Sequence, residues 1–139
     1  KVKTPTLAGK YSEEFNIYAG PKETLQNSIS LFKSVASENG RDEKNLEITT
    51  ACPPVVGLTK ESVDNSLISA AKALIQPEDE IAKNWQDRSY LYGTPEDVVK
   101  TLSMWQEVGI EAVYLQLLDL EQSKRDESVE VIQKAINLL

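Results

Sequence analysis

The clearest pattern of hydrophobic and polar positions runs over residues 93–120, where apolar residues at helical spacing lead into a continuous apolar run. Thr94 is a good N-cap residue, and Asp97 lies three positions later, where its carboxylate can close a capping box. Gly109 suits the left-handed position that ends a helix. The sequence AVYLQLL follows, apolar except for one glutamine and without alternation. These features predict a helix followed by a strand with both faces covered, as in a parallel sheet.

Two earlier parts of the chain predict the same succession of helix and strand. The predicted elements, in order, are a helix over 1–11, a strand over 15–18, a helix over 21–39, a strand over 46–51, a helix that begins at 59, a short helix over 81–86, the helix and strand of 93–120, and a helix over 123–139. This alternation is typical of the α/β class. Residues 59–92 are longer than a usual crossover. They are either a helical insertion at the functional edge of the sheet or an additional structural helix.

The number of predicted strands limits the domain organisation. Three parallel strands leave two long edges unpaired and make an improbable independent fold. An eight-stranded (β/α)8 barrel uses about 30 residues per strand and helix, so 139 residues amount to rather under half of one. We therefore expect residues 1–139 to form a single or partial domain. On its own, such a chain should associate with further copies or form a poorly packed monomer.

Composition and charge exclude several kinds of function. A formal net charge of −7 argues against a nucleic-acid surface, and no apolar run reaches the roughly 18 residues of a membrane span. The absence of histidine, with one cysteine, excludes metal sites built from those ligands and Ser-His-Asp or Cys-His triads within this chain. A single cysteine is compatible with a reducing compartment, so we expect a cytoplasmic location.

Three stretches in this order resemble the C-terminal part of the luciferase-like monooxygenase family of flavin- or deazaflavin-dependent enzymes. The first is KTPTLAGKYSEEFN (3–16), similar to a family helix that precedes a strand. The second is the Gly-Arg-Asp sequence at 40–42 before the next strand, and the third is 93–120. The resemblance implies a bacterial-luciferase-like TIM barrel, of which this chain holds about strands six to eight.

The resemblance also implies a function. The complete protein would be a flavin- or deazaflavin-dependent oxidoreductase or monooxygenase, with FMN or coenzyme F-420 as cofactor and a small organic molecule as substrate. The residues that cradle the cofactor ring in the family are absent here, and so is the histidine that many members use. Activity therefore requires the missing N-terminal half of the barrel as a partner. The alternative is a non-catalytic luciferase-like subunit, or a relic fragment, that acts as an assembly partner.

The candidate cofactor-phosphate residues are Lys3, Thr4 and Thr6. In the family, a glycine-rich turn just before this helix holds the phosphate, and the start of the helix matches here. A helix N-terminus offers free N–H groups and a partial positive charge, to which a lysine and hydroxyls add donors. The alternative is that Thr4 is only an N-cap and Lys3 a solvated charge.

The candidate substrate-pocket residues are Asn16, Tyr18 and Gln116. Asn16 and Tyr18 end a predicted strand, and the carboxyl ends of barrel strands face the active site; asparagine at a strand end is also common in turns. Gln116 is the one polar residue of its strand, so it bonds a ligand or joins an internal network. Asp119, just beyond that strand, is either catalytic or the start of a loop.

Other conspicuous residues have ordinary structural interpretations. Cys52 has no positive neighbours in the sequence and is interpreted as a buried structural thiol. Trp85, Tyr90 and Tyr92 form an aromatic group that either covers a ligand as a lid or holds the insertion in place. The three acidic residues at 78–80 are interpreted as a solvated helix start and not as a metal site.

Overall fold

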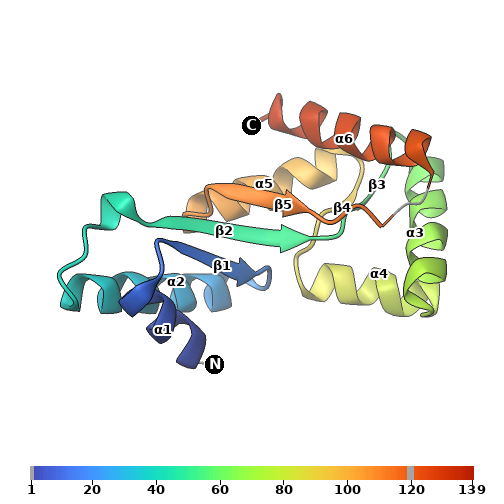
Figure 1. Cartoon of the computed structure of the whole chain (residues 1–139). Helices are drawn as coiled ribbons and strands as arrows, with labels where there is room; N and C mark the ends of the chain where they lie inside the picture. Colours follow the sequence, from blue (N-terminus) through green and yellow to red (C-terminus); the bar gives the residue numbers. More distant parts are fainter. Residues whose placement is uncertain (1, 119–120) are drawn as a thin grey trace.

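The computed structural model describes residues 2–118 and 121–139 (Figure 1). The helices are α1 (Lys3–Tyr11), α2 (Lys22–Glu38), the 3-10 turn η1 (Glu43–Asn45), α3 (Lys60–Leu74), α4 (Glu78–Asp87), α5 (Pro95–Val108) and α6 (Gln122–Ile136). The strands are β1 (Glu14–Tyr18), β2 (Glu47–Cys52), β3 (Val55–Val56), β4 (Tyr92–Gly93) and β5 (Ala112–Leu115). The order of helices and strands predicted from the sequence is confirmed, and the two-residue strands β3 and β4 are additional.

The main sheet is parallel and has the strand order β1-β2-β5. The fully covered strand is β2, because Thr49 and Thr50 are both 0% exposed. The prediction that residues 112–118 form a strand with both faces covered is wrong. Strand β5 ends at Leu115, lies at the edge of the described sheet, and leaves Tyr114 53% exposed. Burial of this segment depends on a neighbouring strand, and on its outer side none exists within the described residues.

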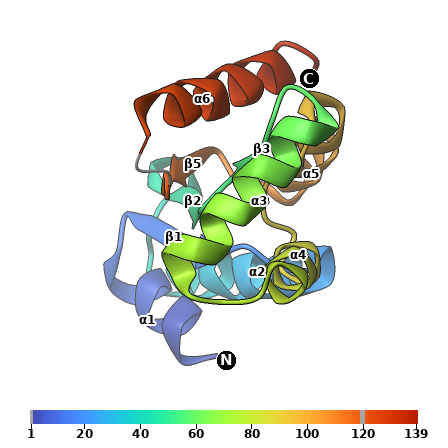
Figure 2. The same ribbon diagram turned by 90° about the vertical axis from the view of Figure 1, so that its right-hand side faces the viewer.

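The helices α2 and α5, which come directly before β2 and β5, lie on one face of the sheet. The strand order advances in one direction along the chain, and right-handed crossovers then place both helices on the same side. Figures 1 and 2 show α2, α5 and α6 on that side. The helices α3 and α4 lie beyond the carboxyl ends of the strands (Figure 1). The core between sheet and helices includes Phe15, Ile17 and Ile48 from the strands, Leu25 and Phe32 from α2, Leu102 and Trp105 from α5, and Val131 and Ile132 from α6.

The Gly-Arg-Asp sequence has a structural role at the end of α2. Gly40 takes a left-handed φ of 71°, which lets the chain turn out of the helix. The Arg41 guanidinium then donates hydrogen bonds to the carbonyls of Ala8 and Gly9, at 3.3 and 3.0 Å. Gly9 is required there, because an added Cβ would lie 2.7 Å from the Phe32 carbonyl oxygen. These contacts hold α1 against α2.

The segment between β2 and α5 forms a second, smaller packing unit. The strands β3 and β4 pair in parallel, and α3 and α4 follow β3. Thr59 and Ser62 close a capping box at the start of α3. Trp85 is buried in this unit, and its indole N–H donates to the Pro53 carbonyl at 2.8 Å. The helical content predicted for residues 59–92 is therefore present, and an aromatic side chain fastens it to the end of β2.

The different burial of β2 and β5 leads to a stability prediction. Ile48→Ala should lower the free energy of unfolding by about 3 kcal/mol, because deleting a fully buried aliphatic side chain leaves a cavity. Leu115→Ala should lower it by roughly 1 kcal/mol, because the half-buried Leu115 removes less surface from water. Urea unfolding of both variants measures the difference. Equal losses would contradict the edge position of β5.

Candidate functional site

One face of the main sheet carries no helix within the described residues, and we call it the open face. Figure 2 looks toward the carboxyl ends of the strands and shows α2 and α5 on the other side of the sheet. Side chains that alternate with the core positions project from this face. They are Glu14, Asn16 and Tyr18 from β1, Glu47, Thr49 and Ala51 from β2, and Ala112 and Tyr114 from β5. Most are polar or aromatic, which is unlike the apolar face beneath the helices.

Hydrogen bonds connect the open face across its strands. The Asn16 side-chain amide donates to the Thr49 hydroxyl at 2.8 Å, and that hydroxyl donates to a Glu14 carboxylate oxygen at 2.5 Å. Thr49 is fully buried beneath these neighbours, so its hydroxyl fixes the orientation of both. Glu47 lies directly beside Glu14 in the register. Two carboxylates in neighbouring positions repel one another.

The Tyr114 hydroxyl belongs to the same group. The negative charge of the Glu14 carboxylate raises the pKa of Tyr114, and partial desolvation, a hydrogen bond to Glu14 and the charge of Glu47 act in the same direction. The phenol therefore stays protonated and is available as a hydrogen-bond donor throughout the neutral range. The hydrogen-bonded group on the open face thus contains the Glu14 carboxylate, the Asn16 amide and the hydroxyls of Thr49 and Tyr114.

The structure places the predicted pocket residues as follows. Asn16 and Tyr18 lie on the open face, and Tyr18 is 82% exposed. Gln116 is exposed, and its backbone N–H extends the ladder by donating to the Cys52 carbonyl at 3.0 Å. Among the described residues, the Gln116 side chain joins no internal network. Asp119 lies outside the described residues. The ligand roles of Asn16, Tyr18 and Gln116 stay predictions.

The candidate phosphate residues lie apart from the open face. The predicted N-cap at Thr4 is wrong, since α1 begins at Lys3 and its N-cap is Val2. The Thr6 hydroxyl donates to the Val2 carbonyl at 2.7 Å. A threonine near the start of a helix can make either this bond or a side-chain cap, and the sequence alone does not decide between them. Lys3 and Thr4 are exposed, and α1 packs against α2. These residues therefore belong to the helix layer, and their role in holding a phosphate stays a prediction.

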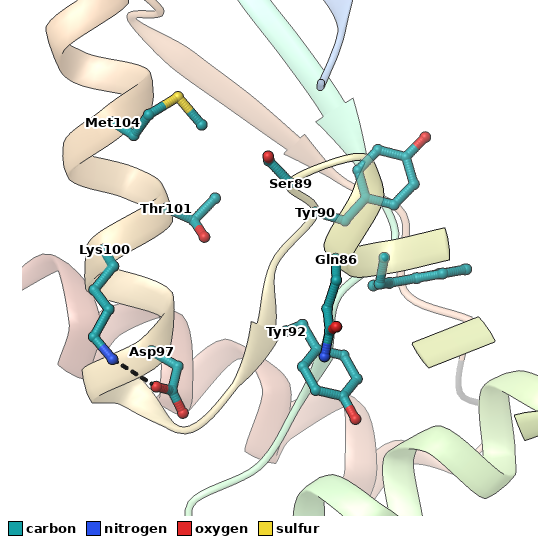
Figure 3. A pocket seen from close by; sticks show the side chains of 9 residues that line it. Gln86, Ser89, Tyr90, Tyr92, Asp97, Lys100, Thr101 and Met104 are labelled. Atoms are coloured by element: carbon teal, nitrogen blue, oxygen red, sulfur yellow. Dashed lines mark hydrogen bonds and ion pairs between the residues drawn. The ribbon is translucent and has the colours of Figure 1, made fainter. Parts of the chain in front are cut away.

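A cleft of about 520 Å³ lies between α5 and the segment that joins α4 to β4. We call it the α4–α5 cleft. Its lining residues are Trp85, Gln86, Ser89, Tyr90, Tyr92, Asp97, Lys100, Thr101 and Met104. Figure 3 shows the side chains of α5 on one wall and those of the α4–β4 segment on the other.

For the aromatic group predicted as a lid or as an anchor, Trp85 has the contacts of an anchor, and the lid role of Tyr90 and Tyr92 stays a prediction. Trp85 is an anchor, since it is buried, bonds Pro53 and packs edge-on against Tyr90 with ring centroids 5.4 Å apart. Tyr90 and Tyr92 are half-buried and line the cleft. Burial, followed by the charge of Asp64, raises the pKa of Tyr92, so this hydroxyl also stays protonated.

Cys52 is fully buried at the end of β2. Burial raises its pKa to about 11, and a backbone hydrogen bond at Leu91 only partly offsets this effect. A thiol with this pKa is almost entirely protonated at neutral pH and is a poor nucleophile. The interpretation of Cys52 as a structural residue agrees with this environment.

The part of the chain that the structure describes brings together no group of three or more His, Cys, Asp or Glu side chains that could hold a metal ion. None of the described helices has the length and apolar character needed to cross a membrane.

The sequence analysis missed Glu14, Thr49 and Tyr114. In EFNIY (14–18), polar or amphipathic residues alternate with Phe15 and Ile17. This alternation was a usable signal that Glu14 shares a face of the strand with Asn16. Thr49 and Tyr114 gave no such signal. Their place on the open face depends on the pairing of β2 with β1 and β5, which only the folded sheet defines.

Comparison with known proteins bears on the fold. No family model matches the sequence, and no curated protein matches it. Solved structures do match. An F420-dependent secondary alcohol dehydrogenase, in complex with an F420-acetone adduct, is 21% identical with a TM-score of 0.69; the match covers 96% of this chain and 46% of that one. The predicted resemblance is confirmed at the level of the fold.

Two further matches have the same character. The coenzyme F420-dependent tetrahydromethanopterin reductase from Methanopyrus kandleri is 14% identical with a TM-score of 0.67, over 99% of this chain and 48% of that one. A riboflavin lyase with modified FMN and its substrate riboflavin is 13% identical with a TM-score of 0.64, over 97% and 40%. The chain thus spans slightly less than half the length of the structures it matches and has their α/β fold over that part.

The geometry of the open face leads to a prediction about Tyr114. Glu14→Gln should lower the pKa of Tyr114 toward the ordinary tyrosine value, because it removes the negative charge that raises it. Titration by NMR with carbon-labelled tyrosine measures this pKa. Glu61→Gln, at an exposed position in α3, is the matched control and should leave it unchanged. A Tyr114 pKa that does not respond to Glu14→Gln would contradict the proximity of the two side chains.

Proposed function

We propose that this chain is part of an F420- or FMN-dependent oxidoreductase or monooxygenase, in which the open face lines the interior of a complete (β/α)8 barrel. One observation carries the proposal: a parallel sheet that is covered by α2 and α5 on one face presents an ordered polar surface on the other. The similarity to F420- and FMN-containing structures supports the choice of cofactor. The single free cysteine supports a cytoplasmic location.

The barrel interpretation follows from the two faces of the sheet. In a (β/α)8 barrel, helices form the outer ring, the inner faces of the strands meet, and the active site lies at the carboxyl ends of the strands. Interior layers of such barrels are usually filled by branched apolar residues. Here the corresponding layers would hold Glu14 beside Glu47, Asn16 beside Thr49, and Tyr18 with Tyr114. A polar interior of this kind suits a binding site better than a packed core.

The chemistry of the open face can be compared with the needs of the cofactor. A flavin or deazaflavin supplies the hydride and electron chemistry itself, and the protein binds and orients it. The open face offers amide, hydroxyl and carboxyl groups and no lysine or arginine, so it fits the polar edge of an uncharged ring or a small substrate. Within the proposal, Asn16, Tyr18 and Gln116 contact that ligand, whereas Glu14 and Thr49 hold Asn16 in position.

A cofactor phosphate needs a different place, because its charge would be repelled by Glu14 and Glu47. The exposed first turn of α1 offers the Lys3 ammonium, the Thr4 hydroxyl and free backbone N–H groups. We retain Lys3, Thr4 and Thr6 as the proposed phosphate residues. The remaining strands of the barrel, which we propose as the partner of this chain, would supply the contacts to the ring.

A second candidate function is that of a non-catalytic assembly partner. The observation in its favour is the unpaired outer edge of β5, next to an apolar cavity of about 210 Å³ that Trp105, Ile136 and Leu139 help to line. The Trp105 indole N–H is buried there without a hydrogen-bond partner among the described residues. Such a surface could hold a second copy or another barrel subunit without any chemistry at the open face.

Cofactor binding distinguishes the two candidates. The chain is joined with the strands that complete the barrel, and F420 or FMN is titrated while its absorbance and fluorescence are followed. We expect one of the two to bind, and Asn16→Ala to weaken binding of cofactor or substrate about tenfold, as loss of one hydrogen bond does. Asn27→Ala, at an exposed position of α2, is the matched control. If a folded complete barrel binds neither cofactor, the oxidoreductase proposal is wrong and the assembly role is favoured.

A further inference from the structure

We propose that the α4–α5 cleft is a second binding site, independent of the open face, for a small uncharged aromatic molecule with hydrogen-bonding substituents, such as a phenol or an aromatic amide. All its lining residues belong to this chain. Its volume of about 520 Å³ lies within the range of small-molecule pockets. The cleft lies between α5 and the smaller packing unit and is lined by described residues of this chain, so the proposed binding does not require the completed barrel.

The first wall of the cleft is a stripe along α5. Asp97, Lys100, Thr101 and Met104 follow one another at helical spacing and project from the same side of the helix (Figure 3). The opposite side of α5 is buried in the main core through Val98, Leu102 and Trp105. The helix is thus fixed by one face and presents the other to the cleft.

The second wall is the segment that leads from α4 to β4. Tyr90 and Tyr92 line this wall with side chains whose hydroxyls point away from α5, and Gln86 and Ser89 contribute an amide and a hydroxyl (Figure 3). This wall is held in place before any ligand arrives. The Trp85 indole bonds the Pro53 carbonyl, and the Tyr90 backbone N–H donates to the Trp85 carbonyl at 2.9 Å. Binding to a preformed wall avoids the entropy cost of ordering a loop.

The tyrosine rings favour an aromatic ligand over a saturated one. Tyrosine rings favour offset or edge-to-face contact with another ring, and the Met104 thioether across the cleft adds a favourable sulfur–aromatic contact. A saturated ring of the same size would lose both interactions. An aromatic ligand is therefore preferred to an aliphatic one.

The charges decide that the ligand is neutral. Lys100 forms an ion pair with Asp97 at 2.9 Å, so the two cancel at the rim. Asp97 also belongs to the cap of α5, where its carboxylate accepts a hydrogen bond from the Thr94 backbone N–H at 3.4 Å. Asp64 lies close enough to Tyr92 to raise its pKa. Because Lys100 and Asp97 already neutralise one another, a charged ligand would have to compete with that ion pair, whereas an uncharged ligand meets hydroxyl and amide groups.

The test uses the chain as it stands. 4-Hydroxybenzamide is titrated into the isotopically labelled protein, and the NMR chemical shifts of the backbone amides and the tryptophan indole N–H groups are followed. We expect saturable shifts centred on Trp85, Tyr90 and Thr101. Cyclohexanecarboxamide should bind at least about tenfold more weakly, since it lacks the ring contacts. Benzoate and benzyltrimethylammonium should also bind more weakly than the neutral probe.

Two variants test whether the probe binds in the cleft. Thr101→Phe fills the cleft and should abolish binding, whereas Thr24→Phe, at an exposed position of α2, should leave it unchanged. Thermal unfolding of both confirms that they fold. Met104→Ala should weaken binding severalfold and serves if Thr101→Phe does not fold.

Several results would overturn the proposal. The first is the absence of saturable shifts up to about 10 mM 4-hydroxybenzamide. The second is equal affinity for cyclohexanecarboxamide, or tighter binding of benzoate or benzyltrimethylammonium. The third is unchanged binding in a folded Thr101→Phe or Met104→Ala variant. None of them depends on F420, FMN or the rest of a barrel, so failure here leaves the proposed oxidoreductase function to its own test.

Discussion

The right-handed crossover between parallel strands is the constraint on which this structure depends. Because the order β1-β2-β5 advances in one direction, each crossover returns on the same side and α2 and α5 cover a single face. That face forms the core through residues such as Phe15 and Ile48. The other face is left to Glu14, Asn16 and Tyr114, which bond with one another or with the buried Thr49 hydroxyl. The same constraint therefore produces both the stable side of the sheet and its candidate chemical side.

Local features of the sequence predicted much of this fold. The α5 cap formed by Thr94 and Asp97 and the left-handed end at Gly109 depend on residues a few positions apart, and all three are confirmed. The prediction that β5 is buried on both faces was wrong, because such burial depends on a strand beyond its outer edge, and none exists within the described residues. The site was harder to predict for the same reason: Thr49 meets Asn16 and Glu14 through strand register, across more than thirty residues of sequence. The segment between β2 and α5 was predicted to be helical, but its cleft arises where the end of α4 and the chain that leads to β4 face α5.

The two candidate sites differ in what they require. The open face is one side of a sheet whose two edges are unpaired within the described residues, and the proposed function places it against further strands that exclude water. The α4–α5 cleft is complete within this chain and is held by the Trp85 contact to Pro53. The solved structures that the chain resembles are at most 21% identical to it, so they bear on the fold and not on either site. The second site rests on its own geometry.

The central claim is that β1 and β5 are interior strands of a larger parallel barrel. Amide hydrogen exchange tests it most directly, by comparing this chain alone with the chain joined to the strands that complete the barrel. In the isolated chain, the amides of β1 and β5 that point away from β2 should exchange rapidly, while those of β2 stay protected. On completion, the edge amides should become as protected as those of β2. Edge amides that remain unprotected in a folded, completed protein would contradict the barrel account.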